Sequence, residues 1–468
     1  MQLHLPEPEG YQPPGEHLVK RWRVRVVSGS ARLGYPQDVI VDPSARETAA
    51  QVWSARVVVV CPLLPYPPVG GGVKRTLRLL EAIERAGGVP HVLTTDPGRP
   101  GAADALRSRG WIVDIADEIP QRLPERVRQH IERRPSPILH AVKARLAQLS
   151  PEAAFVQFES PLSAYYWDEV AGTRVILSTQ NVDSEVLAMV AHGMPRISVP
   201  RLRFMNRSLS MRSVERQAAT RAHAVLCVSD HDQRYFKRYS NRVVEVPNGV
   251  DNEFFGVDPA LPESEDVVFI GQFDYPPNDR GVLRFLREGW PLVRAACPRA
   301  RLLLAGKGMA GALADEAAAA ERVEPLGFVP DAGELLEQSR LVLVPLWQGG
   351  GTRLKVLEAL AAARPVVGTP LAVEGIGFEH GRHGLVGADP PELASQVAEL
   401  LADRDRSEQF ARAGRELAEG CRWEHTTKPA ERLYREWLSA PAPSREPLRE
   451  RAFAREVRGR AGPRTRST

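Results

Sequence analysis

Two cations and a carboxylate stand close together in the stretch GGGTRLKVLEAL, at a spacing that could serve a single ligand. Arg353 and Lys355 follow a run of glycines, and Glu358 comes about one helical turn after Lys355. Uncovered backbone N–H groups at a glycine turn and two positive side chains favour an anion. A carboxylate one turn further along can accept hydrogen bonds from vicinal hydroxyl groups. The pattern indicates a sugar-nucleotide site, with the diphosphate near the cations and the ribose near Glu358.

The flanking segments predict the strand, turn and helix that position these side chains. The apolar run 341–346 is typical of a strand buried on both faces. Thr352 is suited to cap the following helix, and the pair 364–365, Arg-Pro, ends it. Cations in a first turn oppose the helix dipole, so Arg353 and Lys355 are poorly placed for stability alone. The alternative is a solvated helix on which the three charged side chains form a surface network.

The stretch GGGTRLKVLEALAAARPVVGT resembles the donor-site signature of the GT-B glycosyltransferases of the family 4 type, which carry the domain called glycosyl transferases group 1. This resemblance implies that Glu358 binds the donor ribose. It also implies that the turn at Gly350, Gly351 and Thr352 positions the donor. The usual pattern has a second Glu where this chain has Gly350, and a branch of the family carries GGGTRLK here. We therefore expect activity to be retained.

Further donor-binding positions follow from the same resemblance. The family usually has an Arg and then a Lys after the first strand of its second domain. Here Gln272 takes the first place, and Arg280 comes after a longer predicted loop, FDYPPND. More of the diphosphate charge must therefore fall on the cations of the central stretch. Lys307 stands in a GKG turn, and Phe328 and Val329 lie in GFVPD, which resembles the loop that reads the nucleobase.

The first half of the chain has its own glycine-rich turn, in VVVVCPLLPYPPVGGGVKRTLRLLEA. A buried strand, a loop and an amphipathic helix in this order begin the ligand crevice of many open α/β sheets. The glycine spacing matches neither GxGxxG nor the Walker pattern. The resemblance assigns Gly70, Gly71 and Gly72 to a loop that faces the donor phosphates and sugar, whereas a plain tight turn is the alternative. Gln180 and Asn181 stand where family members often have His-Asn, so only a neutral, acceptor-side hydrogen-bonding role carries over.

Two other stretches could suggest a membrane or a metal. Residues 196–216 are rich in Arg with interleaved Leu, Phe and Met, which fits contact with an anionic lipid surface or, alternatively, a solvated helix. The DxD at 230–232 resembles the metal motif of GT-A glycosyltransferases. Here it begins a predicted helix, where acidic residues suit the dipole, so we expect no metal site.

Composition limits the class of protein. A chain of 468 residues predicts two main domains, and a net charge of +4 does not favour nucleic acid as a partner. No apolar run reaches the roughly 20 residues that span a bilayer, and no signal peptide is recognised. The four cysteines are scattered without CxxC spacing, and three of them lie in apolar surroundings, which predicts reduced, buried thiols. We expect a cytoplasmic protein that contacts the inner face of the cell membrane peripherally.

Alternating strands and helices predict two doubly wound, Rossmann-like α/β domains that face each other across a cleft, the GT-B arrangement. The expected division is an N-terminal extension at 1–53, an acceptor-side domain at 54–255, a donor domain at 266–422 and an Arg/Pro-rich disordered tail at 439–468. The segment 423–438 resembles the terminal helix that packs back on the first domain. PNGVD, ending at residue 251, resembles the family's hinge signature.

The resulting expectation is an enzyme that transfers a sugar from a nucleotide-diphosphate donor to an acceptor hydroxyl. The resemblance implies retention of anomeric configuration without a metal or other cofactor. A glycan or lipid-linked acceptor in cell-surface polysaccharide or glycoconjugate synthesis is expected. Two alternatives stay open: a sugar-nucleotide epimerase of the same architecture, and a non-catalytic protein that binds a sugar nucleotide.

Overall fold

A computed structural model describes residues 56–68, 70–96, 98–116, 138–162, 170, 172–350 and 353–440. The predicted N-terminal extension and nearly all of the predicted tail lie outside the described residues. Gly351 and Thr352, two of the expected donor-site residues, lie outside them as well.

The first sheet of the described chain has seven strands in the order β3-β2-β1-β4-β5-β6-β7, all paired in parallel. Its strands are β1 (Arg56–Val60), β2 (Val89–Thr94), β3 (Ile112–Ile115), β4 (Phe155–Phe158), β5 (Arg174–Ser178), β6 (Ala224–Cys227) and β7 (Val243–Glu245). The second sheet has six parallel strands in the order β10-β9-β8-β11-β12-β13. These are β8 (Asp266–Ile270), β9 (Arg301–Ala305), β10 (Val323–Gly327), β11 (Leu341–Val344), β12 (Val366–Gly368) and β13 (Gly384–Val386).

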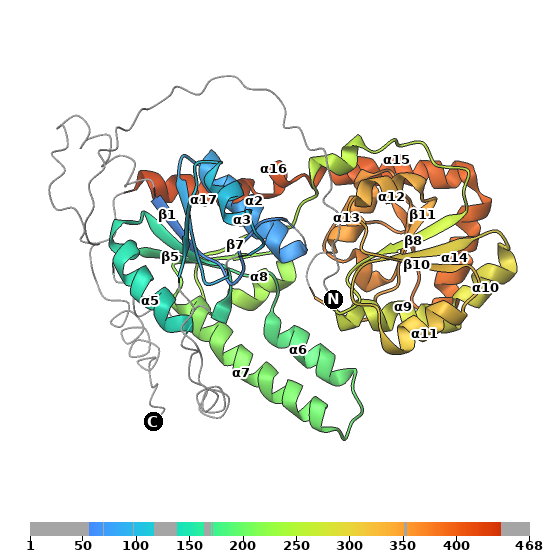
Figure 1. The fold of residues 1–468 in the computed structure, drawn as a ribbon, viewed down its shortest axis with the longest axis horizontal. Coiled ribbons are helices and arrows are strands. Elements are labelled where there is room, and N and C mark those ends of the chain that lie inside the picture. The colour runs from blue at the N-terminus through green and yellow to red at the C-terminus, as the bar shows by residue number, and fades with distance from the viewer. Residues whose placement is uncertain are drawn as a thin grey trace, which may run out of the picture. The chain divides into compact units, whose positions relative to one another are not determined.

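Helices cover both faces of each sheet, as Figure 1 shows. The helices around the first sheet are α2 (Gly71–Arg85), α3 (Ala102–Arg107), α5 (Ile138–Leu149), α6 (Asp183–His192), α7 (Val199–Arg221), α8 (Asp230–Phe236) and α17 (Lys428–Ser439). Those around the second sheet are α9 (Pro276–Glu288), α10 (Trp290–Ala296), α11 (Gly311–Ala319), α12 (Ala332–Gln338), α13 (Leu354–Ala361), α14 (Pro390–Ala402) and α15 (Arg404–Gly420). A short helix, α16 (Trp423–Thr426), precedes α17.

Strand β1 shows why these apolar runs form central strands. Side chains alternate between the two faces of a strand, so Val57 and Val59 enter one core cluster and Val58 and Val60 enter the other. All four are buried, which only a sheet covered on both faces permits. The same division holds along the second sheet, where Phe269 and Val268 lie in different clusters. The predicted doubly wound α/β architecture is confirmed.

Three local predictions need correction. The helix after β1 begins at Gly71, so Gly71 and Gly72 form its first turn, and Gly70, with φ 92°, is the N-cap. The predicted loop FDYPPND is mostly helical, because α9 begins at Pro276. Proline suits a first helical turn, where its missing N–H would have no partner within the helix. The predicted buried thiols hold only for Cys61 and Cys227, since the other two free cysteines are partly exposed.

The end of the described chain packs against the first sheet. Ala430, Leu433, Tyr434 and Trp437 of α17 are buried in the same cluster as Val57 and its neighbours. The phenol of Tyr434 donates to Gln157 Oε1 on β4 at 2.8 Å. In sequence, the strands of the second sheet therefore come between β1 to β7 and α17, although these two segments share one apolar core.

Candidate active site

A cavity of about 1270 Å³ lies beyond the carboxyl ends of β1, β8 and β11. Because strand order reverses beside β1 and β8 in their sheets, each sheet opens a crevice at this position. The cavity is lined by nearly all of the described residues that the sequence assigned to the donor: Gly71, Gly72, Gln272, Lys307, Phe328, Val329, Gly350, Arg353, Lys355 and Glu358. Gln180 and Asn181, which were expected on the acceptor side, line it as well.

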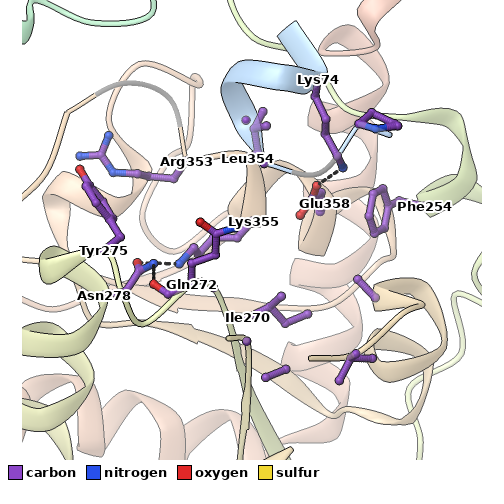
Figure 2. Close-up of a pocket in the computed structure, with 18 of the residues that line it drawn as sticks. Lys74, Phe254, Ile270, Gln272, Tyr275, Asn278, Arg353, Leu354, Lys355 and Glu358 are labelled. Atoms are coloured by element: carbon purple, nitrogen blue, oxygen red, sulfur yellow. Dashed lines mark hydrogen bonds and ion pairs between the residues drawn. The ribbon is translucent and has the colours of Figure 1, made fainter. Parts of the chain in front are cut away.

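Lys355, in the first turn of α13, has its ammonium against an aromatic ring and an amide. Its Nζ donates to Asn278 Oδ1 at 2.9 Å (Figure 2). The same Nζ lies 4.1 Å from the centre of the Phe269 ring. Asn278 in turn donates to the backbone oxygen of Gln272 at 2.6 Å, which fixes the amide orientation. Desolvation lowers the pKa of Lys355 to about 7, despite the opposing effect of Glu358.

Arg353 is the N-cap residue of α13, so the prediction that Thr352 holds this position is wrong. The helix starts one residue later because Arg353 has φ −85° and ψ 87°, outside the helical range. The residue is 9% exposed, and its guanidinium donates to the Gly349 oxygen at 3.1 Å. Burial lowers the pKa of this guanidinium. Figure 2 shows it beside the Tyr275 ring.

Within the described part of the chain, neither Arg353 nor Lys355 forms an ion pair. The predicted alternative, a solvated surface network of the three charged side chains, is wrong. Two desolvated cations whose acceptors are a carbonyl and an amide leave positive charge directed at the cavity. An anionic ligand would neutralise that charge.

Glu358 faces the first domain rather than the two cations. Its Oε1 lies 2.7 Å from Lys74 Nζ on α2 (Figure 2). Lys74 also pairs with Asp251 at 2.9 Å. Burial opposes the charge of Lys74, but the two carboxylates raise the pKa of its ammonium above the ordinary value. Asp251, which ends the PNGVD motif, also pairs with Arg78 of α2 at 2.7 Å.

The other predicted donor residues have different surroundings. Lys307 Nζ lies 4.2 Å from the centre of the Phe328 ring, which is 49% exposed at the cavity. Val329 follows in the same loop. Arg280 does not line the cavity itself; its Nη1 donates at 3.3 Å to Oε1 of Gln348, which does line it.

Sequence reasoning missed Lys74, Asn278 and Tyr275. Lys74 carried a usable signal, because it is a cation in the first turns of a helix without acidic residues there. The same argument from the helix dipole identified Arg353 and Lys355. Asn278 and Tyr275 had no such signal, since only the beginning of α9 at Pro276 brings them to the cavity.

The DxD motif is engaged in local structure. Asp230 pairs with Arg234 within α8, and the Asp232 backbone donates to the Ser229 side chain that caps this helix. His231 contacts Glu185 at 2.7 Å. Among the described residues, no three His, Cys, Asp or Glu side chains are grouped so that they could hold a metal ion.

Two family models match the chain in successive segments. Residues 69–254 match the model described as glycosyltransferase family 4, and residues 264–403 match the model described as glycosyl transferases group 1. The chain belongs to this glycosyltransferase family. The second match contains the central stretch with Arg353, Lys355 and Glu358. Comparison with curated protein sequences gave no match.

Solved structures confirm the GT-B fold of this glycosyltransferase. Anabaena HepE in complex with UDP and glucose is 15% identical, with a TM-score of 0.58 over 82% of this chain and 99% of that chain. Sucrose-phosphate synthase from Thermosynechococcus elongatus is 18% identical, with a TM-score of 0.59 over 82% and 100%. WaaG, a glycosyltransferase involved in lipopolysaccharide biosynthesis, is 15% identical, with a TM-score of 0.57 over 82% and 100%.

Proposed function

We propose that this glycosyltransferase takes a nucleotide-diphosphate sugar as donor and transfers the sugar with retention of configuration, without a metal ion. One observation carries the proposal: Arg353 and Lys355 present positive charge to the cavity without a described carboxylate to pair with. A diphosphate supplies the missing negative charge, and the start of α13 adds backbone N–H groups to the same place. UDP is the first nucleotide to test, because HepE was solved with it.

In the proposed reaction, the bond from the anomeric carbon to the diphosphate oxygen breaks as the acceptor oxygen bonds to that carbon on the same face. Arg353 and Lys355 stabilise the charge that develops on the leaving diphosphate. The acceptor hydroxyl loses its proton to an oxygen of the departing phosphate. Glu358 and the nucleobase loop at Phe328 hold the nucleoside, so the sugar stays positioned through the transfer.

Binding and metal dependence can be tested together in a thermal-shift panel of UDP, GDP, ADP and TDP with their sugars. A ligand at 100 times its Kd adds about 2.7 kcal/mol of stability, which raises Tm measurably. We expect one base to raise Tm equally with and without EDTA. A shift that EDTA abolishes would contradict metal independence. No shift from any nucleotide would contradict both the proposed donor site and the non-catalytic alternative, since each requires a bound sugar nucleotide. NMR of the product anomer then tests retention.

We propose further that the hairpin of α6 and α7 rests on an anionic membrane that carries a glycan or lipid-linked acceptor, which fits cell-surface polysaccharide or glycoconjugate synthesis. The two helices pack side by side (Figure 1). The hairpin exposes large aliphatic side chains: Ile197 at 99%, Val199 at 61%, Leu202 at 69% and Leu209 at 65%. Its exposed arginines include Arg203, Arg207, Arg212 and Arg216.

The distribution of charge on this surface favours contact with an anionic lipid surface over full exposure to water. From residue 195 to residue 221 the only carboxylate is Glu215, which is 0% exposed and accepts from Ser184 and Tyr235. The exposed surface of residues 195–221 therefore combines cations with aliphatic groups and lacks negative charge, as interfacial segments do. The partly exposed carboxylate of Glu185 on α6 contacts His231 instead. No described helix is long and apolar enough to cross a bilayer.

Sedimentation with lipid vesicles tests this contact. The protein is expected to bind vesicles that contain phosphatidylglycerol and to stay free of purely phosphatidylcholine vesicles. Leu202→Ser with Leu209→Ser should reduce binding to the anionic vesicles by about tenfold, because two aliphatic side chains leave the lipid. Leu292→Ser is the matched control, since Leu292 on α10 is 48% exposed and lies outside the hairpin. Equal binding by all variants would contradict the assignment.

A further inference from the structure

Two neighbouring amide side chains occupy the space beside two glycines of the cavity wall. Gln180 and Asn181 lie between β5 and α6 and line the cavity. A Cβ atom on Gly72 would lie 2.2 Å from Gln180 Oε1, closer than real contacts allow. A Cβ atom on Gly350 would lie 3.2 Å from Asn181 Oδ1 and 2.6 Å from a methyl carbon of Val186. No side chain fits at either position: Gln180 occupies the space beside Gly72, and Asn181 and Val186 occupy the space beside Gly350.

The contact at Gly350 explains the missing carboxylate of the family pattern. A Glu at this position would have to project its side chain into Val186 and Asn181. The wall of the cavity therefore carries a neutral carboxamide where the usual pattern carries a negative charge. Unlike a carboxylate, a carboxamide both donates and accepts hydrogen bonds and does not repel a diphosphate.

The hydrogen bonding of Asn181 is incomplete in the described chain. Its Oδ1 is shielded from solvent and accepts no hydrogen bond from the described residues. A buried polar atom without a partner costs free energy unless a bound group completes its hydrogen bonds. In the wall of a ligand cavity, a hydroxyl of the ligand can be that group once the carboxamide adjusts to it.

We propose that Asn181, assisted by Gln180, reads hydroxyl groups of the transferred sugar at the part of the wall where the usual pattern has a Glu. This inference rests on the proposed function, since it assumes a nucleotide-diphosphate sugar in the cavity. The nucleoside diphosphate is then held by Arg353, Lys355 and Glu358 of the second domain. The first domain reads the sugar, so affinity for the nucleotide and affinity for the sugar depend on different parts of the chain.

Calorimetric titration of Asn181→Ala separates the two contributions. UDP, GDP, ADP and TDP and their glucose conjugates serve as probes, and the gain in affinity from adding the sugar is the quantity compared. We expect this gain to fall about tenfold in Asn181→Ala, the effect of one lost hydrogen bond to a ligand. The Kd of the nucleoside diphosphate itself should change less than about twofold, which also shows that the variant folds. Asn241→Ala is the matched control, because Asn241 is exposed and does not line the cavity.

A second set of variants tests whether a Glu at position 350 can take over the role proposed for Asn181. Gly350→Glu alone should bind poorly, because the new side chain meets Val186 and Asn181. Gly350→Glu combined with Asn181→Gly and Val186→Ala provides the space and should regain part of the sugar-dependent gain. An unchanged gain in Asn181→Ala would overturn the inference while leaving donor binding intact. A wild-type protein that binds none of the nucleotides would instead overturn the proposed function and this inference with it.

Discussion

Methionine in place of Lys355 is expected to weaken binding of the nucleotide sugar by about 30-fold to 150-fold. The ammonium donates to the amide oxygen of Asn278 in the cavity wall, and a charge-assisted contact to a diphosphate contributes about 2–3 kcal/mol. Uncharged nucleosides should bind the variant as they bind the wild type. Titration calorimetry with the nucleotide sugar and with the nucleoside measures both effects.

The same lysine gives donor binding a characteristic pH dependence. Its pKa is lowered to about 7 by desolvation, and a diphosphate binds the protonated form. The wild-type Kd should be constant below pH 7 and rise by about tenfold per pH unit above it. The nucleotide sugar is the right probe, because a free nucleoside diphosphate has its own phosphate titration near pH 6. Lys355→Met should show no such slope, and a sloping profile in that variant would contradict the assignment.

Stability of the ligand-free protein should move in the opposite direction. Because the folded-state pKa lies below the unfolded value of 10.5, the unfolded chain holds the proton more tightly between these values. Below pH 7, folding therefore carries the full free-energy cost of burying the protonated Lys355 ammonium. That cost declines as pH rises toward 10.5. Lys355→Met removes the cost, so its Tm should exceed that of the wild type most at low pH. If Lys355 stabilised the folded protein, Lys355→Met would instead have a lower Tm than the wild type.

Glu358→Ala is expected to weaken the binding of nucleosides and of nucleoside diphosphates by the same factor, about tenfold to 100-fold. A carboxylate that accepts from both ribose hydroxyls acts on the part that the two ligands share. The variant also leaves Lys74 with Asp251 as its remaining described carboxylate partner. Calorimetry with uridine and UDP, and with the corresponding pair for any other base that binds, measures the two losses.

Comparison with Lys355→Met makes the test decisive, because that variant should lose affinity only for diphosphates. Lys74→Met combined with Glu358→Ala should be no weaker than Glu358→Ala alone if Lys74 acts by orienting this carboxylate. A loss confined to the diphosphate in Glu358→Ala would show that Glu358 does not hold the ribose.

The sequence was informative where a residue violated a local rule. Arg353 and Lys355 are unfavourable at the start of a helix, and that conflict pointed to an anion before any fold was known. The doubly wound architecture followed from apolar runs such as β1, whose residues suit a strand buried on both faces. Both signals are local, so one sequence was enough to read them.

Residues whose role depends on packing across the two domains could not be found in this way. Glu358 was identified, but its contact with Lys74 joins positions far apart in the sequence. The contact of Asn181 with Gly350 is similar, because no local pattern shows which side chain fills the space beside a glycine. Arg280 was assigned through the family pattern, and no local signal shows that α9 begins at Pro276 and brings its guanidinium to Gln348.

The packing of α17 on the first sheet has a consequence for synthesis of the protein. A ribosome makes β1 to β7 first, yet Leu433, Tyr434 and Trp437 of their core emerge only after the entire second sheet. The first domain must therefore wait with an incomplete apolar core while the second domain folds. Chaperone demand and sensitivity to proteases should be greatest in this interval. A nascent chain that stops before Lys428 would expose that unfilled core for good.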